Sequence, residues 1–184
     1  LWTLFGGGGA WGAWAGRWTA EEGRHSIAIR DYLIVTRAVD PVALEQERMV
    51  HMARGYTPRR MAGPLDGLVY VTLQELATRI AHRNTGAFTG DPLAERLLAR
   101  VALDENLHYT FYRDLASAAL ALDPSAMVLA IRRQVLGFAM PGLELEGFRE
   151  RALTIAAAGI YDLHNHLDQV LCPVLLNHWG LEEL

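Results

Sequence analysis

Two segments of the chain share one pattern, which is an acid, a glutamate, two further residues and a histidine. They are EEGRH, which ends at His25, and DENLH, which ends at His108. Positions three apart share one face of a helix. Each Glu–His pair can therefore bind one metal ion from a single helix; the pairs are Glu22 with His25 and Glu105 with His108. One such match means little, but two matches inside predicted helices favour a metal site. This repeat constrains the fold, because the two helices must bring their polar faces together.

A buried carboxylate needs a paired charge or a metal to offset its desolvation. Two facing helices with this motif would bring four ligands together, and in di-iron bundles a lone glutamate on each of two other helices completes the set. The segment VYVTLQELATRIAHRNTG supplies such a residue, because Glu75 stands among Val71, Leu76, Ala77 and Ile80. Oxygen and imidazole ligands without thiolate suit iron or manganese better than zinc.

Helical segments account for almost the whole chain, and no alternating apolar and polar stretch is long enough to predict a strand. Asp-Pro pairs at residues 40 and 91 predict helix starts, with aspartate as N-cap and proline at the first helical position, and the pair recurs at residue 123. Glycine-containing stretches predict breaks over residues 55–67, after 82 and from 137. We expect helices over residues 11–37, from 41, over 68–82, over 92–122 and over 146–170. The sequence therefore predicts an all-α fold with helices long enough for a bundle.

Composition limits the class of protein. With 184 residues, 51% of them hydrophobic, the chain can bury a good core, and we expect one domain over residues 1–184. The formal charge of −4 has no basic block behind it, which argues against nucleic acid as a partner. The single cysteine, Cys172, excludes an internal disulfide and suits a reducing, cytoplasmic compartment. The opening LWTLFGGGGAWGAWAG contains four consecutive glycines, so we expect no integral membrane segment there.

The segments RWTAEEGRH, QELATRIAHRNTG and DENLH, in this order and at these separations, resemble the di-iron acyl-[acyl-carrier-protein] desaturases, particularly the actinobacterial branch. The resemblance covers nearly the whole chain, including DYLIVTRAVDP after the first motif and GIYDL near the end. It implies an all-α, ferritin-like di-iron helical bundle. As a set these motifs are specific, whereas Glu-x-x-His alone is not.

The resemblance also implies roles for individual residues. Five match the metal ligands of the family: Glu22, His25, Glu75, Glu105 and His108. Three more match positions expected to assist catalysis: Thr78, Trp18 and Asp104. Thr78 corresponds to a threonine beside the oxygen-binding side of the cluster, and Asp104 can accept the free ring N–H of His25 and fix its tautomer.

The family carries a further glutamate ligand on a helix that precedes the first motif, and that helix would here lie before Leu1. Since the sequence does not begin with Met, we expect a chain that is incomplete at its N-terminus and lacks this helix. The glycines at residues 6–9 would then follow the lost helix.

By resemblance, the expected function is oxygen-dependent desaturation of a fatty acyl chain carried on acyl carrier protein. Two iron ions, with manganese as a substitute, would activate O₂ with electrons from a ferredoxin-type donor, and the product would contain a cis double bond. We also expect a homodimer.

Other interpretations compete with this one. The chain could be a ferritin-like iron-binding or storage protein, or a catalytically silent bundle without one ligand helix. The repeat could form a buried polar network without metal, Glu75 could pair with Arg79, and Thr78 could bond back to the carbonyl of Gln74. The segment DLHNHLD could hold a second metal, although solvated helix polarity is the simpler interpretation. Five arginines could meet an acidic carrier protein: Arg54, Arg59, Arg60, Arg132 and Arg133.

Overall fold

A computed structural model describes residues 6–55, 61–143 and 145–182 of the chain. Contacts divide the chain into two compact units, Trp2–Ala62 and Gly63–Leu184, and each unit is described by itself. All regular structure in these described ranges is helical, which confirms the predicted all-α class. The expectation of a single domain stays a prediction.

The first unit contains two helices, α2 (Gly9–Val35) and α3 (Pro41–Arg54). The Asp-Pro pair begins α3 as predicted, because the Asp40 carboxylate accepts a hydrogen bond from the backbone N–H of Val42 at 2.8 Å. Arg30 on α2 lies 4.0 Å from the Glu45 carboxylate on α3, measured from Nε to Oε1.

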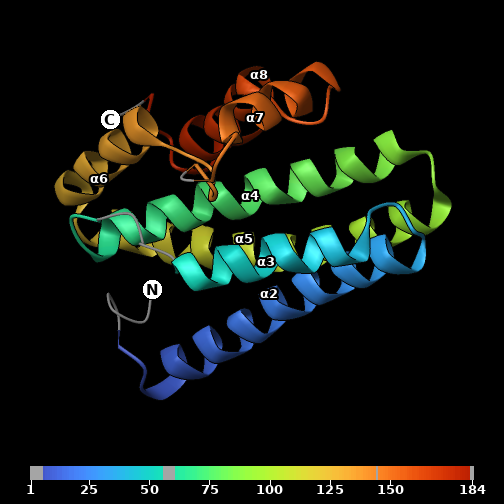
Figure 1. Ribbon diagram of the computed structural model, residues 1–184. Helices are drawn as coiled ribbons and strands as arrows, with labels where there is room; N and C mark the ends of the chain where they lie inside the picture. Colours follow the sequence, from blue (N-terminus) through green and yellow to red (C-terminus); the bar gives the residue numbers. More distant parts are fainter. Residues whose placement is uncertain (1–5, 56–60, 144, 183–184) are drawn as a thin grey trace. The chain divides into compact units, whose positions relative to one another are not determined.

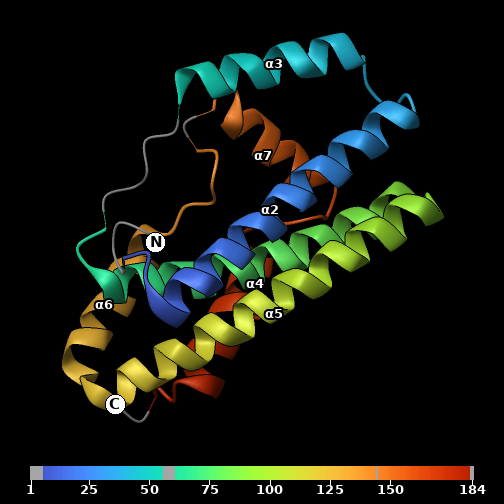
Figure 2. The same ribbon diagram turned by 90° about the horizontal axis from the view of Figure 1, so that it is seen from below.

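The second unit contains the remaining elements: α4 (Pro64–Thr89), α5 (Pro92–Leu122), α6 (Pro124–Gly137), α7 (Phe148–Ala157), α8 (Leu163–His166) and the π-helical stretches η1 (Leu167–Leu171) and η2 (Pro173–His178). The helices α4 and α5 lie side by side along most of their length (Figures 1 and 2). Only Gly90 and Asp91 join them, so they run antiparallel. The carboxylates of Asp91 and Asp123 cap α5 and α6 through the amides of Leu93 and Ala126, at 2.8 and 3.0 Å.

The core of this unit lies along the α4–α5 pair. Both helices bury apolar side chains, among them Leu68, Val69, Leu73, Leu76, Ala77 and Ile80 on α4 and Ala94, Leu98, Val101, Ala102 and Tyr112 on α5. Each large apolar side chain that is fully buried contributes about 1.5–3 kcal/mol. In the described part of the chain, no helix is both long and apolar enough to cross a membrane.

The helix α4 is longer than predicted at both ends. It begins at Pro64, and it continues through the NTGAFTG segment to Thr89, where the sequence predicted a break. Gly86 stays inside the helix and permits a close approach to α5, because an added Cβ there would lie 3.2 Å from the Cα of Glu95. The helix ends instead at Gly90, whose φ of 64° is a left-handed conformation that suits glycine.

The single long helix predicted over residues 146–170 is wrong. The helix α7 ends at Ala157, and Gly159 has a φ of 69°, which breaks the helix. Asp162 then starts α8 with a capping box, in which its side chain accepts the amide of Asn165 at 2.8 Å. Farther on, Pro173 has no amide hydrogen to donate to a regular α-helix, and the chain winds as a π-helix on both sides of Cys172.

An ion pair fixes the first turn of α4 to α6. Asp66 is buried, and both of its carboxylate oxygens accept hydrogen bonds from the Arg133 guanidinium at 2.8 Å. The side chain of Gln134 donates a third bond at 2.9 Å. These donors, with Arg133 first, hold the pKa of Asp66 below its usual range. Arg133 therefore has a structural partner, which weakens the expectation that it meets a carrier protein.

Candidate metal centre

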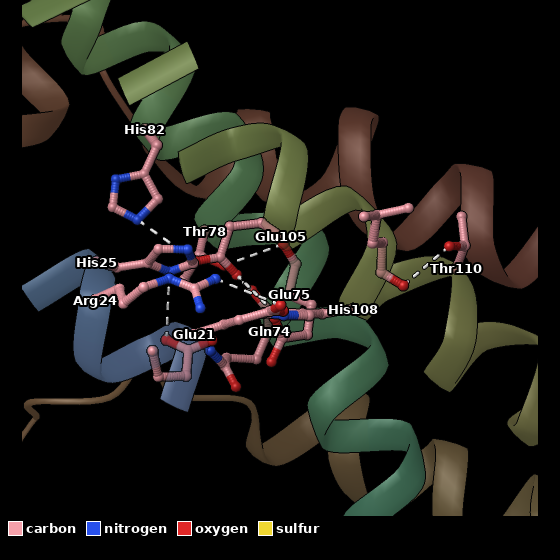
Figure 3. A network of polar contacts seen from close by, with 12 residues as sticks. Glu21, Arg24, His25, Gln74, Glu75, Thr78, His82, Glu105, His108 and Thr110 are labelled. Carbon is pink, nitrogen blue, oxygen red and sulfur yellow. Dashed lines mark hydrogen bonds and ion pairs between the residues drawn. The ribbon is translucent and has the colours of Figure 1, made fainter. Parts of the chain in front are cut away.

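Three potential metal ligands meet inside the second unit. Glu75 on α4 and His108 on α5 are fully buried, with 0% of each side chain exposed, and Glu105 on α5 is 3% exposed. Each offers a ligand atom, and these atoms lie within 4.8 Å of one another. Figure 3 shows these side chains pointing toward one another from the two helices. The antiparallel α4–α5 pair thus brings together Glu75 and the Glu-x-x-His motif of α5.

Two carboxylates converge on one imidazole nitrogen. The Nδ1 atom of His108 lies 3.2 Å from Oε2 of Glu75 and 3.8 Å from Oε2 of Glu105. The imidazole can carry at most one positive charge against the two negative charges of ionised carboxylates. A divalent cation bound by all three groups would offset that imbalance in a place with almost no water. Two oxygen donors and one nitrogen donor fit iron or manganese.

Thr78 lies one turn beyond Glu75 on α4 and touches the same cluster. Its hydroxyl oxygen is 3.1 Å from Oε2 of Glu105, 3.1 Å from the carbonyl of Gln74 and 3.0 Å from the carbonyl of Glu75. A hydroxyl has one proton, so it donates to one of these acceptors at a time. Thr78 therefore lies within hydrogen-bond distance of both the Gln74 carbonyl and the candidate ligand Glu105.

His82 joins this cluster, although the sequence interpretation did not select it. Its Nε2 atom lies 3.8 Å from Oε1 of Glu105. Glu75, Thr78 and His82 stand at positions i, i+3 and i+7, which is one face of a helix. That spacing is the signal in the sequence from which His82 could have been identified.

The first motif is preserved within its own helix. On α2, Nδ1 of His25 lies 3.8 Å from Oε2 of Glu22, as the i,i+3 spacing predicts. The preceding acid, Glu21, interacts with Arg17 at 3.1 Å and with Arg24 at 3.4 Å. Two arginines of the same helix therefore partly neutralise the charge of Glu21. Glu22 and His25 lie close enough together to bind one ion.

The repeat extends beyond the two five-residue segments, to an arginine on the preceding helical turn. Asp104, which precedes Glu105, pairs with Arg100 at 3.2 Å, just as Glu21 pairs with Arg17. The full pattern is an arginine, three residues, an acid, a glutamate, two residues and a histidine. In both copies the arginine sits one turn before the acid, where oppositely charged side chains meet on a helix.

Other expectations have mixed outcomes. The role of Asp104 toward His25 and the role of Trp18, which lies half-buried one turn before Glu22 on α2, stay predictions. Glu75 lies beside His108, and Arg79 forms no ion pair or hydrogen bond within the described ranges, so the proposed Glu75–Arg79 pair is not seen.

The DLHNHLD segment does not gather metal ligands. Asp162 caps α8, and Nδ1 of His166 shares a hydrogen bond with the hydroxyl of Tyr161 at 2.8 Å. Outside the centre described above, no other group of three potential ligands converges in the described part of the chain. Arg59 and Arg60 lie outside the described residues.

Comparison with known proteins places this chain in a family. A family model for fatty acid desaturases matches residues 6–184. DesA1 of Mycobacterium tuberculosis, whose name places it among the acyl-[acyl-carrier-protein] desaturases, is 49% identical over 182 residues, or 95% of this chain and 54% of DesA1. DesA2 of the same organism, named in the same way, is 36% identical over 171 residues, or 93% of this chain and 61% of DesA2. The X-ray structure of DesA2 aligns with a TM-score of 0.77 and 32% identity, over 93% of this chain and 65% of that structure.

These matches confirm the predicted resemblance and the all-α, ferritin-like bundle. The chain spans about half the length of the curated relatives it matches. The family match, by contrast, covers nearly every residue of the chain, including both Glu-x-x-His motifs and the Glu75 segment. The chain therefore belongs to the fatty acid desaturase family.

Proposed function

We propose that this chain carries the metal centre of an enzyme that desaturates a fatty acyl chain bound to acyl carrier protein. The observation that carries the proposal is the buried convergence of Glu75, Glu105 and His108 on adjacent helices. The names of DesA1 and DesA2 support the substrate class. They do not favour the alternative of an iron-storage protein.

The proposed metal set contains two iron ions, with manganese as a substitute. Glu75, Glu105 and His108 would hold them together with Glu22 and His25 of α2. Support for the two α2 residues comes from the repeated motif and its shared geometry, because Glu22 and His25 lie as close together on α2 as Glu105 and His108 do on α5, at 3.8 Å in both pairs. When bound, iron supplies the activation of O₂.

Several residues act around the metals. The Thr78 hydroxyl, 3.1 Å from Oε2 of Glu105, would hold a proton beside this ligand and serve as a proton donor in the reaction. Asp104 would accept the ring N–H of His25 and fix the imidazole tautomer, and Trp18 would support α2 beside Glu22. Burial of Glu75 and His108 would keep bulk water away from the bound metals.

The overall reaction removes one hydrogen from each of two adjacent acyl carbons and leaves a cis double bond. Two electrons from a ferredoxin-type donor and two protons complete the reduction of O₂ to two water molecules. The acyl chain would lie bent in an apolar slot beside α4, with Ala77 as the candidate slot residue. A cytoplasmic homodimer is the proposed working form.

The test is a reconstituted reaction with the product of the complete reading frame, a ferredoxin, its reductase, O₂ and acyl-[acyl-carrier-protein] substrates. Gas chromatography should find a mono-unsaturated product. Glu105→Ala should abolish that product, because it removes a ligand from the centre. Glu150→Ala, which removes an exposed glutamate of α7, is the matched control and should retain activity.

A second variant tests the acyl slot. Ala77→Leu should shorten the longest chain that is desaturated while iron binding stays unchanged, because a larger side chain would fill the slot next to α4. Iron oxidation without an unsaturated product from any acyl chain length would support the storage interpretation instead.

A further inference from the structure

A cleft in the second unit carries charges that the proposed metal centre does not use. Its volume is about 550 Å³, which is in the range of small-molecule sites, and it lies among α4, α5 and η1. Residues of α4 line one wall, Glu95 and Ala99 of α5 line another, and Gln169 of η1 closes the third. None of its lining residues is among the proposed metal ligands.

Two arginines stand on the α4 wall, one helical turn apart. Arg79 and Arg83 occupy positions i and i+4, so their guanidinium groups share one face of the helix and repel each other. In the described ranges, neither forms a hydrogen bond or an ion pair. Guanidinium groups keep their charge and offer paired N–H donors that match a carboxylate or a phosphate. Within these ranges, the two positive charges on α4 therefore have no ion-pair partner that would offset their mutual repulsion.

The floor of the cleft is apolar. Leu76 and Ile80 line it with less than a tenth of their surface exposed, and Ala87 and Ala99 extend the apolar lining. A simple inorganic anion would leave this surface uncovered, whereas a molecule with an acidic head and a hydrocarbon tail would cover both parts.

The polar rim limits the charge of the ligand. Two guanidinium groups face one carboxylate, that of Glu95, so the three charges sum to +1. The side-chain amide of Asn84 is already engaged, because it donates to the carbonyl of Ile160 at 2.8 Å. The balance favours a ligand with a single negative charge.

We propose that this cleft binds a monoanionic amphiphile, with its acidic group on Arg79 and Arg83 and its hydrocarbon on Leu76 and Ile80. The acidic group is a carboxylate, as in a free fatty acid, or a phosphodiester. The binding is independent of the proposed desaturation, because it involves none of the metal ligands and is measured on metal-free protein.

Isothermal titration of the metal-free protein tests this site with three probes: decanoate, methyl decyl phosphate and the neutral decan-1-ol. Either anion should bind, and the tighter one identifies the head group, whereas decan-1-ol should bind at least tenfold more weakly. Arg79→Gln and Arg83→Gln should each weaken anion binding about tenfold or more, since each removes a charge-assisted hydrogen-bond partner.

Two charge controls sharpen the test. Arg96→Gln changes the net charge equally but lies on α5 outside the cleft lining, so binding should stay within about twofold of the unaltered protein. Glu95→Gln should tighten anion binding a few-fold, because it removes the one carboxylate of the cleft. Circular dichroism checks that each variant is folded, and Arg79→Met or Arg83→Met, which also removes the charge, replaces the corresponding glutamine variant if that variant fails to fold.

Equal anion affinity in the unaltered protein, Arg79→Gln and Arg83→Gln would overturn the proposal, even if decanoate bound at some other apolar place. Equal affinity for decanoate and decan-1-ol would also overturn it, since the arginines would then contribute nothing.

Discussion

Two buried carboxylates on α4 should respond in opposite ways to neutralisation. Asp66 and Glu75 lie on the same helix, and each is almost fully buried. Asp66 is held by the Arg133 guanidinium, whereas Glu75 faces a second carboxylate, Glu105, across the imidazole of His108. If the role of Glu75 is to bind metal, its charge should destabilise the metal-free protein. The charge of Asp66 should not, because Arg133 offsets it.

The magnitudes follow from these surroundings. The effective cost of burying one carboxylate is several kcal/mol, and a hydrogen bond that involves a charged group returns about 1.5–3 kcal/mol. Glu75→Gln keeps the shape and removes the charge, so we expect metal-free protein to gain about 2 kcal/mol, or roughly 4–8 °C in Tm. Asp66→Asn weakens a bidentate pair of charge-assisted hydrogen bonds, and the 47% exposure of the arginine side chain reduces their worth, so we expect a loss of about 1–2 kcal/mol.

The assay is thermal and urea unfolding followed by circular dichroism at pH 7, with a chelator present. Addition of Fe²⁺ in its place should raise the Tm of the unaltered protein and of Asp66→Asn but not that of Glu75→Gln, because only the last variant lacks a ligand. If Glu75→Gln instead destabilised the metal-free protein as much as Asp66→Asn does, Glu75 would belong to a structural polar network, and the metal interpretation would fail.

Two further predictions concern packing and pH. Burial lowers the pKa of His166 in the folded protein. Below about pH 6.5 the unfolded chain therefore binds a proton at this histidine more readily than the folded chain does. The free energy of unfolding should fall as the pH drops below that value. His166→Phe should flatten this part of the pH profile in urea titrations, whereas Tyr161→Phe should keep it and lower stability by about 1–3 kcal/mol through loss of the 2.8 Å hydrogen bond. Gly86→Ala should destabilise the protein by about 1 kcal/mol, because the new Cβ would crowd the backbone of Glu95. In the same assay, Gly16→Ala should stabilise its helix by about 0.5–1 kcal/mol, because nothing lies within 4 Å of the added atom.

Features that depend on neighbours in the sequence were predicted well. The Asp-Pro pairs at residues 40 and 91 start helices because the carboxylate caps the free amides locally, and no distant contact is needed. Glu105 and His108 share a face for the same reason. Glu75 was identifiable as a candidate because an acid among apolar neighbours on a helix needs a buried partner.

Features that depend on distant contacts were predicted poorly. Gly86 resembles a helix terminator, but it lies in a helix where Glu95 of α5 comes too near for a larger residue. His82 has no motif of its own, and its place near Glu105 follows only from the antiparallel pairing of α4 and α5. The sequence does not predict the break at Gly159, because the surrounding residues have strong helical patterns and a single glycine within such a pattern is an ambiguous signal.

The most direct test of the proposed centre is anomalous diffraction at the iron absorption edge from crystals grown with Fe²⁺ under anaerobic conditions. We predict iron peaks within coordination distance of Glu75, Glu105 and His108, and their loss in crystals of Glu105→Ala. A well-ordered structure with these three side chains in contact and no iron between them, or with iron bound only elsewhere, would contradict this prediction.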